Sequence, residues 1–171
     1  MTEVAAAPRW SSALDGMAYE LVQAADGVCI EVERSALHET LLRLRDQGGF
    51  AMCTFVTAVD HYPREPRFQL NHQLLSLAHR DRLRVRTWLG GDDACAPTCS
   101  DIWRGANWME RECFDMFGIR FDGHPDLRRL LMPEGYGQHP LRKEFPHKGI
   151  EPDRLYREWD RKRREGWSEP R

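Results

Sequence analysis

The sequence predicts a two-layer α+β domain, in which helices cover one face of a small mixed sheet, followed by a long irregular C-terminal arm. Three patterns predict this class: apolar segments of strand length, segments with helical spacing of apolar residues, and a C-terminal third rich in proline and glycine. With 171 residues, 41% of them hydrophobic, the chain can bury one sizeable core. We therefore expect one domain over residues 1–117 and an arm over residues 118–171.

The expected domain begins with a helix, a strand and a second helix. Residues 12–25, SALDGMAYELVQAA, suit a first helix, although part of residues 1–25 is expected to be disordered. The apolar run VCIEV, residues 28–32, suits a strand. In ALHETLLRLRDQ leucines recur at helical spacing until Gly48 ends the pattern, so a helix is expected over residues 36–47.

Three further segments have strand patterns. FAMCTFVTAV, residues 50–59, is mostly apolar at both odd and even positions, which is typical of a buried strand. Residues 68–79 and 82–89 flank a short polar turn at Arg80 and Asp81, which predicts a hairpin. The second hairpin strand alternates apolar or threonine side chains with arginine or tryptophan. One face of the sheet should therefore contact the core, and the other should contact solvent or a partner.

A helix is expected over residues 98–117. Thr98 follows a proline and has Asp101 three residues later, as in a capping box, and Gly118 stands where a helix commonly ends. At about 100° per residue, the helix has one apolar stripe formed by Ile102, Ala106, Met109, Cys113, Met116 and Phe117. This stripe is expected to pack on the sheet.

The charged residues of this helix lie around the stripe. Glu110 falls on one edge of it, Glu112 and Asp115 share the other edge, and Arg111 points roughly away from it. This division of the acids disfavours a single metal site. It favours carboxylates that accept hydrogen bonds from arginines or backbone N–H groups where a helix meets a packed interface. Arg111, Arg128 and Arg142 are the predicted partners, at the junction where the domain becomes the arm.

The arm has unusual composition. Residues 118–152 contain five prolines and five glycines, which disfavour regular helix, yet they also carry apolar side chains. Such a segment is too long and too apolar for an ordinary loop, so it should lie on another surface. A short surface helix is expected at its end, with Asp153 near the start, a basic second half, and three apolar side chains on one side: Leu155, Tyr156 and Trp159.

Charge and missing motifs exclude several functions. The net charge of −2, divided as −5 over residues 1–117 and +3 over residues 118–171, lacks the clustered basic surface of a nucleic-acid binder. No phosphate-binding loop, dinucleotide fingerprint or four-cysteine iron–sulfur run is present. The odd number of cysteines, five, indicates reduced thiols in a reducing compartment. No apolar run is long enough to span a membrane, so membrane association is expected only through a partner.

Two other classes of function remain open from the residues alone. A self-standing hydrolase would use Glu110, Glu112 and Asp115 as acid and base, although no nucleophile elbow or phosphate loop accompanies them. A zinc-binding adaptor would recruit Cys95 and Cys99 with scattered histidines, although zinc sites usually show two close ligand pairs. Structural ion pairs are the plainer interpretation of the three acids.

Residues 110–149, ERECFDMFGIRFDGHPDLRRLLMPEGYGQHPLRKEFPHKG, closely resemble the 30 kDa subunit of respiratory complex I, the C type of subunit in bacterial NADH-quinone oxidoreductase. The resemblance is carried by E-R-E-x-x-D-x-x-G, by a histidine and an arginine four residues apart, and by H-P-L-R-K. The matching positions are Glu110, Arg111, Glu112, Asp115, Gly118, His124, Arg128, His139, Pro140, Leu141, Arg142 and Lys143. A looser likeness covers most of residues 28–149.

The resemblance implies a structural subunit in the hydrophilic arm of that complex, peripheral to the cytoplasmic face of the bacterial inner membrane. Residues 118–171 would wrap the quinone-site subunit, which is of the 49 kDa type, and the chain would contact iron–sulfur subunits. NADH would be oxidised through FMN and iron–sulfur clusters in those partners, with electrons passing to quinone and protons translocated. This chain would hold no cofactor, metal or active site. The equivalent subunit of a membrane-bound hydrogenase, or of a quinone reductase with another electron donor, is the alternative.

Overall fold

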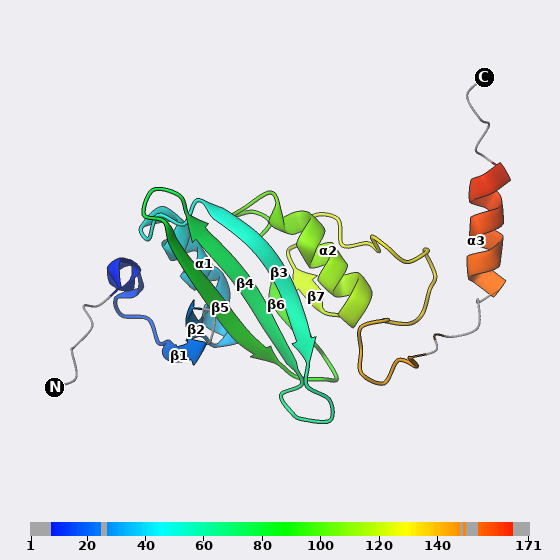
Figure 1. Ribbon diagram of the computed structural model, residues 1–171, viewed down its shortest axis with the longest axis horizontal. Helices are drawn as coiled ribbons and strands as arrows, with labels where there is room; N and C mark the ends of the chain where they lie inside the picture. The colour runs from blue at the N-terminus through cyan, green and yellow to red at the C-terminus, as the bar shows by residue number, and fades with distance from the viewer. Residues whose placement is uncertain (1–7, 25–26, 148, 150–153, 166–171) are drawn as a thin grey trace, which may run out of the picture.

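The computed structural model describes residues 8–24, 27–147, 149 and 154–165, and it shows helices packed on a mixed sheet (Figure 1). The elements, with η for a 3₁₀ helix, are η1 (Arg9–Leu14), β1 (Glu20–Ala24), β2 (Gly27–Glu31), η2 (Arg34–Ala36), α1 (Leu37–Asp46), β3 (Met52–Asp60), β4 (Phe68–Ser76), β5 (Asp81–Leu89), β6 (Cys95–Pro97), α2 (Ala106–Phe117), β7 (Arg120–Asp122) and α3 (Arg154–Glu165). The predicted α+β class is confirmed.

Five strands form the main sheet in the order β1-β2-β5-β4-β3. The β2–β5 pair is parallel and the other pairs are antiparallel, so the sheet is mixed as predicted. The hairpin prediction is also confirmed, with Phe68 opposite Leu89 and Ser76 opposite Asp81. Along β5, Leu83, Val85, Thr87 and Leu89 are buried, whereas the residues between them are at least partly exposed.

The core lies between this sheet and helices α1 and α2. On α1 the three leucines at helical spacing, Leu37, Leu41 and Leu44, are fully buried. On α2 the predicted stripe is buried except for the half-buried Met109, and Phe117 meets Phe68 of β4 edge to face at 6.4 Å between ring centroids. All five cysteines are free and buried. The helical and strand periodicities therefore placed the core correctly.

Two expected helices differ from the structure. Residues 12–25 do not form one helix: η1 ends at Leu14, and the chain then forms β1. Gly16 with φ of 79° separates them, and β1 pairs with β2 through Leu21 opposite Ile30. Helix α2 begins at Ala106 rather than Thr98. Because the hydroxyl and N–H groups of residues 98 and 99 donate to a side chain of α2 instead, the preceding segment forms turns.

The first residues after α2 belong to the body of the molecule. Strand β7 pairs in parallel with β6, which precedes α2, and buries Phe121, while Ile119 is fully buried. Beyond β7, the described chain runs irregularly until α3, whose last turn is basic as expected. Asp153 lies outside the described residues, as do the side chains of Leu155, Tyr156 and Trp159. No helix within the described ranges is long and apolar enough to cross a membrane.

Candidate functional site

Helix α2 is covered on two opposite sides. Its apolar stripe contacts the sheet, where the Cys113 thiol donates to the Val56 carbonyl at 3.5 Å. On the other side the arm covers Arg111, which is only 5% exposed. The Arg111 guanidinium donates to the backbone carbonyls of Arg128 at 3.1 Å and Arg129 at 3.0 Å. Arg111 does point away from the sheet as expected, but it fixes the arm backbone rather than a carboxylate.

Asp115 binds the arm most extensively. Its carboxylate is fully buried and accepts the backbone N–H groups of three consecutive arm residues at 2.7–3.0 Å: Leu130, Leu131 and Met132. Arg129 Nη1 donates to the other carboxylate oxygen at 2.7 Å. Burial alone would raise the pKa of Asp115, but these donors outweigh burial and lower it. The structure brings Arg129 to Asp115, rather than the expected Arg111, Arg128 or Arg142.

Glu110 has a different task. Its buried carboxylate accepts the Thr98 hydroxyl at 2.5 Å and the Cys99 N–H at 2.6 Å, so it ties the segment before α2 to the helix. Burial raises the pKa of Glu110 despite these bonds. His124 Nε2 lies 3.9 Å from it. Because His124 Nδ1 accepts the Asp126 N–H, Nε2 carries the proton and donates to a backbone carbonyl of α2 at 3.2 Å.

The arm also satisfies the last carbonyl groups of α2, which a helix leaves without internal partners. His139 Nδ1 donates to the Asp115 carbonyl at 2.9 Å, and the Leu141 N–H donates to the Met116 carbonyl at 3.1 Å. Arg142 Nε donates to the Phe117 carbonyl at 2.6 Å. Burial lowers the pKa of His139, which favours its neutral form.

Gly118 is required at the end of α2 for two reasons. Its φ is 76°, a left-handed conformation that other residues adopt at a cost. In addition, a Cβ atom here would lie 2.6 Å from both Arg142 Nη2 and His139 Nε2. The arm therefore returns against the helix end so closely that only a glycine leaves room for it.

A second attachment was not predicted. Asp60, at the end of β3, accepts the Lys143 N–H at 2.8 Å and both Arg67 Nε and Nη2, at 2.8 and 2.7 Å. Arg67 also pairs with Glu144 of the arm. Burial alone would raise the pKa of Asp60, but Arg67 and two backbone N–H groups lower it to about 2. The only signal in the sequence was a polar residue that ends an apolar strand.

The remaining motif residues leave side chains at the surface. Glu112 is exposed and makes no hydrogen bond or ion pair within the described part of the chain. Arg128 is also exposed and pairs with Asp126 at 2.9 Å. Pro140 is half-buried, whereas Leu141 is 51% exposed and the Lys143 side chain is exposed. These side chains contribute nothing visible to the fold and are available to another molecule.

The buried acids give no geometry for catalysis or metal binding. Glu110 and Asp115 are occupied by donors from this chain, and Glu112 lies apart from them at the surface. Among the residues with described positions, no group of three or more His, Cys, Asp or Glu side chains could hold a metal ion. The expected zinc ligand Cys95 instead donates its thiol to Asp122 at 2.8 Å. The site is a set of attachments between a helix and an arm.

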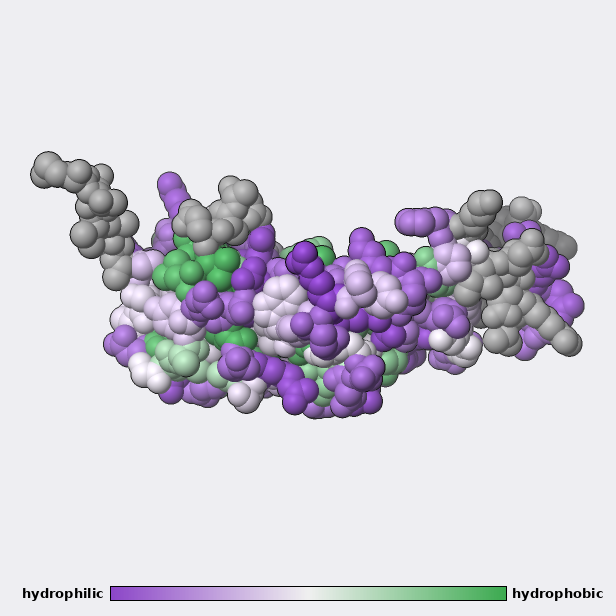
Figure 2. Space-filling model, turned by 90° about the horizontal axis from the view of Figure 1, so that it is seen from below, coloured by the Kyte–Doolittle hydropathy of each residue, from purple (hydrophilic) through white to green (hydrophobic). Residues whose placement is uncertain are grey.

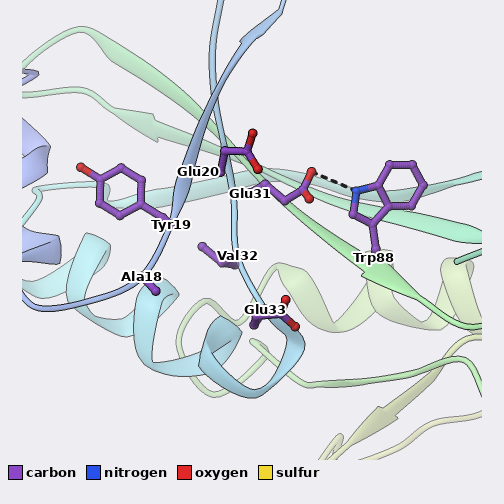
Figure 3. A pocket seen from close by; sticks show the side chains of 7 residues that line it. All are labelled: Ala18, Tyr19, Glu20, Glu31, Val32, Glu33 and Trp88. Atoms are coloured by element: carbon purple, nitrogen blue, oxygen red, sulfur yellow. Dashed lines mark hydrogen bonds between the residues drawn. The ribbon is translucent and has the colours of Figure 1, made fainter.

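Another group of acids lines a surface hollow of about 240 Å³ at β1, β2 and β5 (Figure 3). Glu20, Glu31 and Glu33 surround it together with Tyr19 and Trp88. Glu31 already accepts the Trp88 indole N–H at 2.9 Å and, through the same oxygen, a guanidinium N–H of the neighbouring arginine of β5 at 2.7 Å. This carboxylate thus stabilises the sheet face.

Comparison with known proteins gives consistent matches. The family model described as "Respiratory-chain NADH dehydrogenase, 30 Kd subunit" matches residues 30–151. The NADH-quinone oxidoreductase subunit of the C type from Geobacter sulfurreducens is 41% identical over 128 residues, covering 74% of this chain and 78% of that protein. NADH dehydrogenase (ubiquinone) iron-sulfur protein 3, mitochondrial, of Candida albicans is 42% identical over 126 residues, covering 72% of this chain and 45% of that protein.

Two solved structures share the fold. The trypsin-resistant fragment (1–134) of Nqo5 superposes with a TM-score of 0.59 at 31% identity, covering 64% of this chain and 89% of that one. A chain of the membrane-bound sulfane sulfur reductase, an archaeal respiratory membrane complex, superposes with a TM-score of 0.69 and covers 94% of this chain and 92% of that one. At 22% identity this second likeness shows the fold alone. The family match over residues 30–151 and the relatives above 40% identity show that this chain belongs to the respiratory-chain NADH dehydrogenase 30 kDa subunit family.

Proposed function

We propose that this chain is a cofactor-free structural subunit of the hydrophilic arm of NADH:quinone oxidoreductase, in the position of the 30 kDa subunit. The observation that carries the proposal is the use of the motif residues: Glu110, Arg111, Asp115 and His139 hold the helix and arm together through their buried polar groups. A site for acid/base or redox chemistry needs a group that is free to react. The oxidation of NADH, through FMN and iron–sulfur clusters, is therefore assigned to partner subunits.

The arm is proposed to hold the quinone-site subunit, of the 49 kDa type. Its backbone is fixed from beneath by Arg111 and Asp115, yet it presents Leu131 and Leu141 outward, 61% and 51% exposed. Trp108 of α2, 59% exposed, also faces outward. Large apolar side chains on a rigid backbone are typical of a protein interface. A hollow of about 430 Å³ around Leu141 and Phe145 offers a place for a partner side chain.

The proposed setting follows from the same role. The chain would be peripheral, attached to the cytoplasmic face of the bacterial inner membrane through the complex, and it would also contact iron–sulfur subunits. Figure 2 shows one face of the molecule, on which hydrophilic residues predominate and hydrophobic ones form small separate patches. Such a surface suits contacts with proteins rather than with lipid tails.

The test is purification of the tagged full-length chain from its native membrane, with identification of the accompanying subunits. Leu141→Asp should remove the quinone-site subunit from the purified material, because it places a charge in the proposed interface. Leu21→Asp is the matched control, since Leu21 is 54% exposed on β1, at the edge of the sheet opposite to β3, where Asp60 attaches the arm. Equal recovery of the partner with both variants would contradict the proposed role of the arm.

The same purification separates the two related functions. A complex with another electron donor, such as a membrane-bound hydrogenase, would yield the quinone-site-type partner without flavin-containing NADH-oxidising subunits. Both complexes would use this chain as a structural part, so only the accompanying chains distinguish them. Recovery of an NADH-oxidising subunit supports the proposal, and its consistent absence from an otherwise intact complex overturns it.

A further inference from the structure

A basic hollow lies at the end of the sheet opposite the arm's attachment to β3. It has about 520 Å³ of space between η1 and the turn that joins β4 to β5. In Figure 1, η1 lies beside this end of the sheet. Arg9, Arg80, Arg82 and His79 line the hollow, with Asp81 as the single acid. Residues 1–117 carry a net charge of −5, so this concentration of cations runs against the charge of the surrounding domain.

The arginines of this hollow differ from most others in the chain. Neither Arg9, Arg80 nor Arg82 has a hydrogen bond or ion pair to its guanidinium within the part of the chain that the structure describes. Exposed or partly exposed arginines elsewhere pair with a carboxylate of this chain, namely Arg43, Arg45, Arg86, Arg120 and Arg128. Three unpaired guanidinium groups around one hollow are therefore available to an anionic ligand.

Arg80 has a further peculiarity. It is the only residue other than glycine with a positive φ, 56°, among the described residues. Glycine or asparagine would adopt this conformation at lower cost, since a left-handed conformation strains most other residues. A long cationic side chain at a strained turn position, lining a hollow, is the kind of outlier that indicates a functional contact.

The floor of the hollow selects the class of ligand. It is formed by the Trp10 ring, which is almost buried, by Val28, 39% exposed, and by Ala78. A free phosphate or a nucleic-acid backbone would leave these apolar groups uncovered, and the net charge of the chain disfavours nucleic acid. An acidic peptide segment with one apolar side chain would use both the floor and the rim.

We propose that this hollow binds an acidic segment of a neighbouring subunit, with carboxylates on Arg80 and Arg82 and an apolar side chain over Val28. The inference rests on the proposed function, because the neighbour is a subunit of the same complex. It adds a second interface, distinct from the C-terminal arm, at the opposite end of the sheet.

The experiment is photo-cross-linking in cells that make the full-length tagged chain. Ala78→p-benzoylphenylalanine places the probe in the floor and leaves the arginines unchanged, and Leu141→p-benzoylphenylalanine reports assembly through the arm. After irradiation and purification, mass spectrometry identifies the cross-linked peptide. The expected product from position 78 joins this chain to another subunit at a segment with at least two Asp or Glu residues.

The charges are tested in the same strain. R80E/R82E should lower the cross-link from position 78 about tenfold, since two surface ion pairs of ordinary strength become repulsive. Changing the identified partner acids to lysine should restore it. R64E/R104E is the charge-matched control, because both arginines are exposed and without partners among the described residues, and it should leave the yield unchanged.

Three results would overturn the inference. These are a cross-link from position 141 with none from position 78, a position-78 product with lipid, nucleic acid or another part of this chain, and an equal yield with R80E/R82E. In each of these cases the arm cross-link still supports the proposed function. Absence of cross-links to other subunits from both positions, with no other chain accompanying the purified protein, would instead refute the proposed function.

Discussion

Asp60 provides the sharpest test of how the arm is attached. Its side chain is 1% exposed and joins three parts of the chain: the end of β3, Arg67 of the following loop, and Lys143 of the arm. Asp60→Asn keeps the shape but removes the negative charge. The Arg67 guanidinium, 10% exposed, then loses its buried partner and retains only the half-exposed Glu144.

The magnitude follows from the pKa. Lowering the pKa of Asp60 from 3.8 to about 2 corresponds to about 2 kcal/mol of stability. Because the folded pKa lies below the unfolded one, this contribution is fully present above pH 3.8 and is lost as the pH falls toward 2. At pH 7 the variant should therefore unfold with a free energy about 2 kcal/mol lower, and the difference from wild type should shrink below pH 3.8.

The assay is urea unfolding of the purified full-length chain at pH 7 and at several values below pH 4, together with limited proteolysis of residues 118–171. The arm should be cut faster in the variant, because the Lys143 N–H loses its charged acceptor. Asp81→Asn is the control, since its carboxylate makes no ion pair in the described chain. Equal stability of Asp60→Asn and wild type at pH 7 would refute the assigned role of this carboxylate.

Three further substitutions test the other attachments and the core. Gly118→Ala should destabilise the chain by about 1–3 kcal/mol and speed cleavage of the arm, because φ at this position is 76° and the new Cβ meets the arm at 2.6 Å; unchanged thermal unfolding would contradict this. Asp115→Asn should lower the unfolding free energy by about 3 kcal/mol by leaving Arg129 without its buried partner, whereas Glu112→Gln, at the surface, should change it by less than about 0.5 kcal/mol; equal effects would contradict the assignment. His72 is fully buried, neither ring nitrogen has a partner among the described residues, and burial lowers its pKa to about 4. Since the unfolded histidine binds a proton below about pH 6.5, the wild type should lose about 2 kcal/mol between pH 7.5 and pH 5 that His72→Leu does not lose; parallel pH profiles in urea unfolding would show that His72 does not titrate this way.

The elements that the sequence predicted correctly are those governed by local periodicity. The leucines of α1, the alternation along β5 and the stripe of α2 each place apolar side chains on the face that the structure buries. The failures occurred where a distant group decided the local structure. Thr98 was expected to begin a helix, but its hydroxyl donates to Glu110 twelve residues later, and a helix begins only at Ala106.

The candidate site divides in the same way. The motif from Glu110 to Lys143 identified the correct region, and the family match covers it. The pairing within it was not predictable, because Asp115 contacts Arg129 rather than the neighbouring Arg128, a choice set by the path of an irregular chain. The structure also showed that Glu112, similar to its neighbours in sequence, is the one acid of the three left at the surface.

The sequence by itself determined which segments form the sheet, which face of α2 packs on it, and to which family the chain belongs, because these depend on residue spacing along the chain. Only the tertiary structure decided that the arm first binds its own domain, through Asp115, Arg111 and Asp60. It also placed Arg9, about seventy residues before Arg80 in sequence, beside the same hollow. Contacts of this kind depend on how distant segments meet in space, and no periodicity along the chain encodes them.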